Sequence, residues 1–166
     1  MITASIVAYH TPTDELTHLL DCIVSSNIDI LYLIDNSSND SLRELGNTSS
    51  KIVYIYSDNL GFGHGHNIAI RKAIEKKAQY HIVINPDIYW EGPVIESLAA
   101  YMNNNLACGL VMPKILYPDG GIQYLCKLLP TPMNLLGRRF LPFKSWVSKM
   151  DERYEMRFAN YDEEME

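Results

Sequence analysis

Four short polar clusters in this sequence carry groups that could bind a small anionic ligand. Each follows a run of apolar residues typical of a buried strand. The clusters are Tyr9-His10-Thr11, Asp35-Asn36, the stretch 59–67 and Asn85-Pro86-Asp87. Because ligands of open parallel sheets bind outside the carboxyl ends of the strands, the clusters predict one binding site along a shared edge. For any single cluster, an ordinary polar loop stays the alternative.

Asp87 is the residue best suited to hold a metal ion. Pro86 fixes its own φ and favours extended backbone at Asn85, so the turn is stiff and the direction of the carboxylate is set. Magnesium prefers oxygen ligands and typically binds one or two carboxylates together with substrate phosphates. We therefore predict that Asp87 binds a divalent metal ion, Mn²⁺ or Mg²⁺, which also contacts a pyrophosphate. A merely solvated carboxylate is the alternative.

The stretch 59–67, with the sequence NLGFGHGHN, could cradle a phosphate. Gly61, Gly63 and Gly65 would let backbone amides approach an anion, and the helix that follows adds the dipole of its N-terminus. The stretch is neither G-x-G-x-x-G nor a P-loop, and it follows the third strand, which argues against NAD binding. A glycine turn required only by the backbone is the alternative.

The histidines give weaker signals. The two-residue spacing of His64 and His66 does not place them on one helix face, so a histidine metal site is disfavoured. We expect His66 to make a polar contact near the bound anion, and the role of His10 stays open. His18 and His81 are interpreted as ordinary helix and strand residues.

Strands and helices must alternate to bring the clusters to one edge. Apolar runs predict strands at 5–9, 30–34, 52–56, 81–84 and 106–112, and helical spacing predicts helices at 14–25, 67–77 and 94–102. Thr13 is the expected N-cap of the first helix, and Ile70, Ala73 and Ile74 the buried face of the second. Apolar strands that alternate with helices indicate an α/β fold, with a doubly wound, mostly parallel sheet covered on both faces.

The bulk composition narrows the class of protein. The chain has 166 residues, 47% of them hydrophobic and 20% charged, which fits a globular protein with a sizeable core. A net charge of −6 gives no reason to expect a nucleic acid partner. No apolar run approaches the roughly 20 residues of a membrane helix, and no secretory signal is visible. Cysteines at positions 22, 108 and 126 are widely spaced, which favours reduced thiols in a cytoplasmic protein.

The later part of the chain differs in character. Asp119-Gly120 predicts the turn of a hairpin. Residues 138–150 combine four basic side chains with interleaved aromatic ones and contain no acid. This pattern suits a peripheral contact with an anionic membrane, at its inner face. The alternative is a segment that packs against a further part of the protein.

Five segments in order resemble the N-terminal half of family 2 glycosyltransferases with the GT-A fold, of the rhamnosyltransferase-like kind that builds bacterial surface polysaccharides. They are SIVAYH at 5–10, IDNSSND at 34–40, NLGFGHGHN at 59–67, NPD at 85–87 and MPKILYPDGGIQ at 112–123. The NPD segment corresponds to the D-x-D motif of the family. The resemblance implies a Rossmann-like nucleotide-sugar-binding half over 1–130 and a partly irregular tail over 131–166.

The resemblance also implies an activity: inverting, metal-assisted transfer of a sugar from a nucleoside-diphosphate sugar to a glycan or lipid-linked acceptor. Asp35 would hydrogen-bond the base, and Asp87 would hold the metal on the diphosphate, where it stabilises the leaving group. The nucleotide-sugar site would comprise Ala8, Tyr9, His10, Asp35, Asn36, Asn59, Gly61, Gly63, Asn67 and Asn85. His10 stands where the family usually has Asn, and Asn85 where it has the first Asp.

One expected family feature is missing from the sequence. Nothing after Asp87 matches the E-D-x-D-like motif whose acid deprotonates the acceptor hydroxyl. We therefore expect the general base to lie beyond Glu166 and this chain to be a fragment that holds only the donor site. The alternative is a non-catalytic nucleotide-binding or interaction module. A nucleotidyltransferase is disfavoured, because the first strand lacks a glycine-rich and basic signature.

Overall fold

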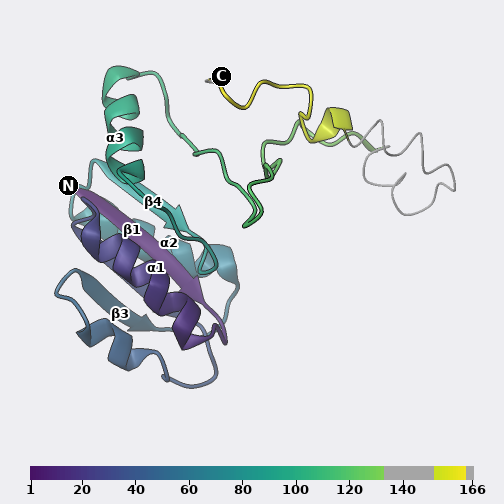
Figure 1. Ribbon diagram of the computed structural model, residues 1–166. Coiled ribbons are helices and arrows are strands. Elements are labelled where there is room, and N and C mark those ends of the chain that lie inside the picture. The colour runs from purple at the N-terminus through teal and green to yellow at the C-terminus, as the bar shows by residue number, and fades with distance from the viewer. Residues whose placement is uncertain (133–151, 164–166) are drawn as a thin grey trace, which may run out of the picture. The chain divides into compact units, whose positions relative to one another are not determined.

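A computed structural model of the chain describes residues 1–132 and 152–163. The chain divides into two compact units, Met1–Val111 and Met112–Glu166, which are described separately. Figure 1 shows the elements of the first unit, which contains all the named helices and strands. The functional division that we expected after residue 130 stays a prediction.

The first unit is a parallel sheet whose strands alternate with helices. Its strands lie in the order β3-β2-β1-β4, and each neighbouring pair is parallel. This arrangement confirms the predicted α/β fold and the Rossmann-like order of a GT-A N-terminal part. In chain order, the elements are β1 (Ile2–Ala8), α1 (Thr13–Ser25), β2 (Ile30–Asp35), the 3-10 helix η1 (Arg43–Asn47), β3 (Ile52–Tyr56), α2 (Phe62–Glu75), β4 (Tyr80–Ile84) and α3 (Val94–Asn104).

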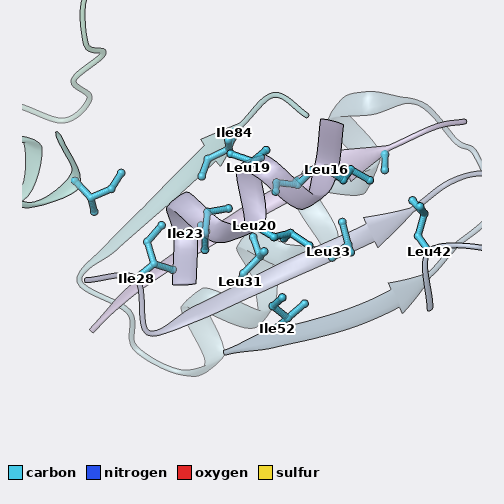
Figure 2. Close-up of a cluster of buried hydrophobic side chains, with 14 residues drawn as sticks. Leu16, Leu19, Leu20, Ile23, Ile28, Leu31, Leu33, Leu42, Ile52 and Ile84 are labelled. Atoms are coloured by element: carbon cyan, nitrogen blue, oxygen red, sulfur yellow. The ribbon is translucent and has the colours of Figure 1, made fainter. Parts of the chain in front are cut away.

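One face of the sheet carries the main hydrophobic core, beneath α1 (Figure 2). Helical spacing turns one side of α1 toward the strands. Four residues of α1 pack there against side chains of β1 and β2: Leu16, Leu19, Leu20 and Ile23 against Ala4, Ile6, Ala8, Leu31 and Leu33. Fully burying such a leucine or isoleucine contributes roughly 1.5–3 kcal/mol to the stability of the fold, so the packing of α1 on this face stabilises the sheet.

The opposite face of the sheet lies beneath α2, which is drawn behind the strands in Figure 1. Its apolar cluster is smaller and consists of Val7, Tyr32, Ile34 and Ala69. Thr3 and Ser5 of β1 are also fully buried. The interpretation of β1 as apolar is therefore correct for its α1 side, whereas its other side carries Thr3 and Ser5 together with Val7, since side chains alternate along a strand.

The predicted strand at 106–112 is wrong. These residues form no strand, and Leu106 and Leu110 are 89% and 83% exposed. An apolar run becomes a strand only where a neighbouring edge pairs with its backbone, and the run itself does not supply that partner. Within the described residues, β4 has a single neighbour, β1.

The helix starts also differ from the expected ones. Helix α1 begins at Thr13, so Pro12 and not Thr13 is its N-cap. Helix α2 begins at Phe62 rather than at residue 67, so most of the supposed glycine-rich turn is helical. Gly61, with a φ of 99°, is the N-cap, and this left-handed region favours glycine.

The buried face of α2 agrees with the predicted one at Ala73, but not at Ile70, which is half-buried, or at Ile74. Its buried residues are Gly65, His66, Ala69 and Ala73, whereas Ile74 is 70% exposed. The apolar pattern pointed to Ile70 and Ile74 because it gave no weight to glycine and histidine. Close packing on β1 instead favours the small residues Gly65, Ala69 and Ala73, and His66 is buried with a hydrogen bond to Ser5.

The second unit contains the predicted hairpin turn in a short form. Leu116 and Ile122 form an isolated antiparallel bridge, and the backbone N–H of Tyr117 donates to the carbonyl of Gly121 at 2.7 Å. The carboxylate of Asp119 accepts from the N–H of Gly121 at 2.9 Å. The basic and aromatic segment 138–150 lies outside the described residues. Among the helices that are described, none has the length and apolar character to cross a membrane.

Candidate functional site

The strand register brings the four polar clusters to one edge of the sheet. Ala8 at the end of β1 pairs with Asp35 at the end of β2, which pairs with Tyr56 at the end of β3. Ile6 of β1 pairs with Ile84, the last residue of β4. The loops that follow these strands are therefore neighbours, as predicted.

Two aromatic residues, Tyr9 and His10, directly follow β1 at this edge. Tyr9 is 57% exposed, and its ring meets that of His10 edge to face, with centroids 4.4 Å apart. His10 has a φ of 53°, which few non-glycine residues adopt, although histidine tolerates it better than most. Its backbone N–H donates to Ser37 Oγ at 3.0 Å. The loop is thus held against the one after β2, and the two rings stand at 66° to each other.

Asp35 braces the loop after β2 from inside the protein. Its side chain is fully buried, and its carboxylate accepts one hydrogen bond from the Tyr54 hydroxyl at 2.8 Å and another from the Ser37 N–H at 3.0 Å. Burial, and next the hydrogen bond to Asp35, raise the pKa of Tyr54 well above its usual value, so the phenol stays protonated and donates. The structure therefore gives Asp35 two protein partners that the sequence analysis did not predict.

Asn36 lies next to Asp35 and is 3% exposed. Its backbone N–H donates to the carbonyl of Ala8 at 2.9 Å, which joins the exits of β1 and β2. Its side-chain Oδ1 has no hydrogen-bond partner within residues 1–132 and 152–163. An unpaired buried acceptor is costly, so this oxygen is a candidate contact for a ligand.

The start of α2 provides amides for an anion. The Asn59 side chain accepts from the Gly61 N–H at 3.1 Å and so shapes the entry to the helix. No side chain caps the N-terminus of α2 within the described part of the chain. Because the first N–H groups of a helix lack intrahelical acceptors, those of Phe62 and Gly63 can bind a phosphate. Asn67 is exposed further along the same helix.

Gly65 does not belong to this anion-binding group, contrary to expectation. Its N–H donates to the Gly61 carbonyl at 3.2 Å and is therefore used within the helix. A Cβ placed on Gly65 would lie only 2.7 Å from Val7 Cγ2 and 3.4 Å from Asn36 Nδ2. The absence of a side chain at this position lets α2 approach β1 closely.

Asp87 and Asn85 follow β4, and both are exposed. Among the described residues, neither side chain makes a hydrogen bond or ion pair, and no three His, Cys, Asp or Glu side chains gather to hold a metal. One carboxylate and one amide oxygen are hard ligands of the kind that Mg²⁺ and Mn²⁺ prefer. This donor set fits a cation that is completed by substrate phosphates and water.

His66 differs from the sequence-based interpretation, whereas His81 lies in a strand, β4, as expected. His66 is 4% exposed, so it lies inside the protein rather than beside a bound anion, and its Nδ1 is 2.8 Å from Ser5 Oγ. His81 is hydrogen-bonded to both Ser5 and Thr3. Burial lowers the pKa of His66, while burial and the nearby His66 lower that of His81 to about 4. Both imidazoles are consequently neutral at pH 7.

Comparison with protein families gives an independent result. The family described as Glycosyl transferase family 2 matches residues 4–146, a span that includes every predicted site residue. No curated protein sequence matches the chain. Members of such a family transfer a sugar from a nucleotide-sugar donor to an acceptor. The length of the matched span shows that the chain belongs to glycosyl transferase family 2.

Proposed function

We propose that the carboxyl edge of the sheet is the donor site of a glycosyltransferase that uses a nucleoside-diphosphate sugar and transfers the sugar to a glycan or lipid-linked acceptor. The observation that carries the proposal is the convergence of the four loops. Backbone hydrogen bonds join the exits of β1, β2 and β3, through Asn36 to Ala8 and through Ser57 to Asp35. The first turn of α2 lies beside Asn36, since a Cβ placed on Gly65 would be 3.4 Å from Asn36 Nδ2.

The nucleoside is assigned to the exits of β1 and β2. Tyr9 and His10 offer their exposed rings to the base, beside the loop that follows Asp35 and Asn36. Asp35 acts by holding this loop, because its buried carboxylate accepts hydrogen bonds from Tyr54 and Ser37. Asn36 lies next to it, and its Oδ1 has no hydrogen-bond partner in the part of the chain that the structure describes.

The diphosphate is assigned to the start of α2 and to the turn after β4. The amides of Phe62 and Gly63 face it with the positive end of the helix dipole. Asp87, with Asn85 beside it, holds the divalent cation, which when bound stabilises the negative charge on the departing nucleoside diphosphate. An inverting transfer also needs a base at the acceptor hydroxyl. We assign that role to no residue of the described chain.

Calorimetry with UDP, GDP and dTDP tests the donor site directly. We expect one of them to bind with a dissociation constant in the micromolar range, equivalent to about −8 kcal/mol. The corresponding monophosphate is the matched control, and we expect it to bind at least about tenfold more weakly, because the diphosphate contacts are lost. If none of the three diphosphates binds in the presence of Mn²⁺, the proposed function is wrong.

A further inference from the structure

A chain of hydrogen bonds crosses the buried space between α2 and the sheet. Thr3 Oγ1 of β1 is 2.9 Å from His81 Nδ1 of β4, and His81 Nε2 is 2.9 Å from Ser5 Oγ of β1. Ser5 Oγ is in turn 2.8 Å from His66 Nδ1 of α2. Ser5 is fully buried and His66 nearly so. Three elements of the fold are thus joined by side chains that the donor site itself does not use.

The proton positions in this chain follow from counting donors. Thr3 Oγ1 donates to the Tyr80 carbonyl at 3.3 Å, so it accepts from His81 Nδ1–H. His81 Nε2 then bears a lone pair and accepts from the Ser5 hydroxyl, which leaves Ser5 Oγ to accept from His66 Nδ1–H. This arrangement gives every proton an acceptor and leaves only a lone pair on His66 Nε2, which has no partner among the described residues. Both imidazoles are neutral in it, in keeping with their lowered pKa values.

A ring contact connects His66 to the start of α2, which we assign to the diphosphate. The ring of Phe62, the first residue of α2, meets the ring of His66 edge to face with centroids 4.4 Å apart. Phe62 directly follows Gly61, whose N–H is held by Asn59. A displacement of His66 would therefore move the amides that we assign to the diphosphate.

The two faces of the sheet hold their helices by different forces. Helix α1 packs through aliphatic side chains, and such contacts tolerate small shifts because the hydrophobic effect has no direction. A hydrogen bond requires a donor–acceptor distance of 2.7–3.2 Å and a favourable angle. The bond from His66 to Ser5 consequently fixes where α2 sits along β1, in a way that the small apolar cluster on the α2 side of the sheet does not.

We propose that His66, held by Ser5 and His81, is a positioning residue of the donor site, which sets the place of the α2 N-terminus and hence of its phosphate-binding amides. The proposal rests on the proposed function for its effect on nucleotide affinity. Its effect on the helix itself can be measured without any nucleotide.

The test compares His66→Asn with His66→Leu in the full chain. Asparagine and leucine have nearly the same shape, but only asparagine puts an N–H where His66 Nδ1 stands. We expect His66→Leu to speed amide hydrogen exchange over residues 65–69 of α2 at least tenfold relative to α1, and to weaken binding of the preferred nucleoside diphosphate about tenfold. His66→Asn should restore most of both. His64→Leu, on the same helix and outside the hydrogen-bonded chain, should leave the exchange rates unchanged.

Two results would overturn the proposal. One is a His66→Leu protein with the exchange rates and affinity of the wild type, and the other is equal loss in His66→Asn and His66→Leu, which would show that the hydrogen bond is irrelevant. If His66→Leu does not fold, Ser5→Ala removes the same bond by deleting one hydroxyl and is judged by the same criteria. A wild-type chain that binds no nucleotide would defeat the proposed function, whereas the exchange rates would still decide whether His66 holds α2.

Discussion

Replacing Asp87 with asparagine is expected to abolish most of the gain in nucleoside diphosphate affinity that Mn²⁺ provides. Asparagine keeps the shape of the side chain and removes its charge. Asp87 provides the single carboxylate of the proposed metal site. We expect the affinity in Mn²⁺ to fall by about tenfold to a hundredfold, which corresponds to about 1.4–2.7 kcal/mol. Calorimetry with and without Mn²⁺ measures the change, and the affinity without metal should stay the same.

Glu91→Gln is the matched control for this experiment. Glu91 is an exposed acid four residues further along the same loop, and it makes no ion pair with any described residue. Its replacement should leave the Mn²⁺ dependence intact. Asp87→Asn protein that binds the diphosphate in Mn²⁺ as tightly as the wild type would show that Asp87 is not a metal ligand. Equal losses in the two variants would instead indicate a general effect of charge.

The second large effect is expected at Gly65. An alanine Cβ there would overlap Val7, at 2.7 Å from Cγ2 and 3.0 Å from Cγ1, so α2 must move away from β1. Val7 and position 65 belong to closely packed elements, β1 and α2. Overpacking of this kind typically costs about 1–3 kcal/mol. We expect Gly65→Ala to lower the free energy of unfolding by that amount, as measured by urea denaturation.

Gly63→Ala supplies the comparison on the same helix. Apart from its chain neighbours and the backbone of its own helix, no atom of the described residues lies within 4 Å of a Cβ placed on Gly63, and its φ is not in the left-handed region. Because glycine is a poor helix former, alanine at this position should leave the free energy of unfolding unchanged or raise it by up to about 1 kcal/mol. Equal destabilisation by both substitutions would contradict the close packing of α2 on β1.

The sequence predicted the sheet and the edge at which the polar clusters gather, because both depend on local patterns. Apolar runs located β1, β2, β3 and β4 within a few residues, and each polar cluster directly followed one of them. Parallel topology then placed the four clusters together without further information. These features need only the periodicity and order of the chain.

The remaining features depend on contacts between residues that are far apart in the sequence. Tyr54 reaches Asp35 across 19 positions, and His66 reaches Ser5 across 61. No local pattern marks either pair. The early start of α2 was missed because glycines suggest a turn, whereas Gly65 is needed for the approach of the helix to Val7. The prediction of a strand at 106–112 was wrong for a similar reason. A strand needs a pairing partner elsewhere in the chain, and an apolar run does not show whether that partner exists.

Mapping of nucleotide contacts by NMR tests the central claim most directly. On titration with the preferred nucleoside diphosphate and Mg²⁺, amide shifts should concentrate at Tyr9, Asn36, Gly61, Gly63 and Asp87, at the carboxyl edge of the sheet. The chain offers an alternative place, a cavity of about 480 Å³ whose lining includes Cys22, Ser26 and Glu96. Shifts confined to that cavity, or no shifts at the edge at saturation, would contradict the account.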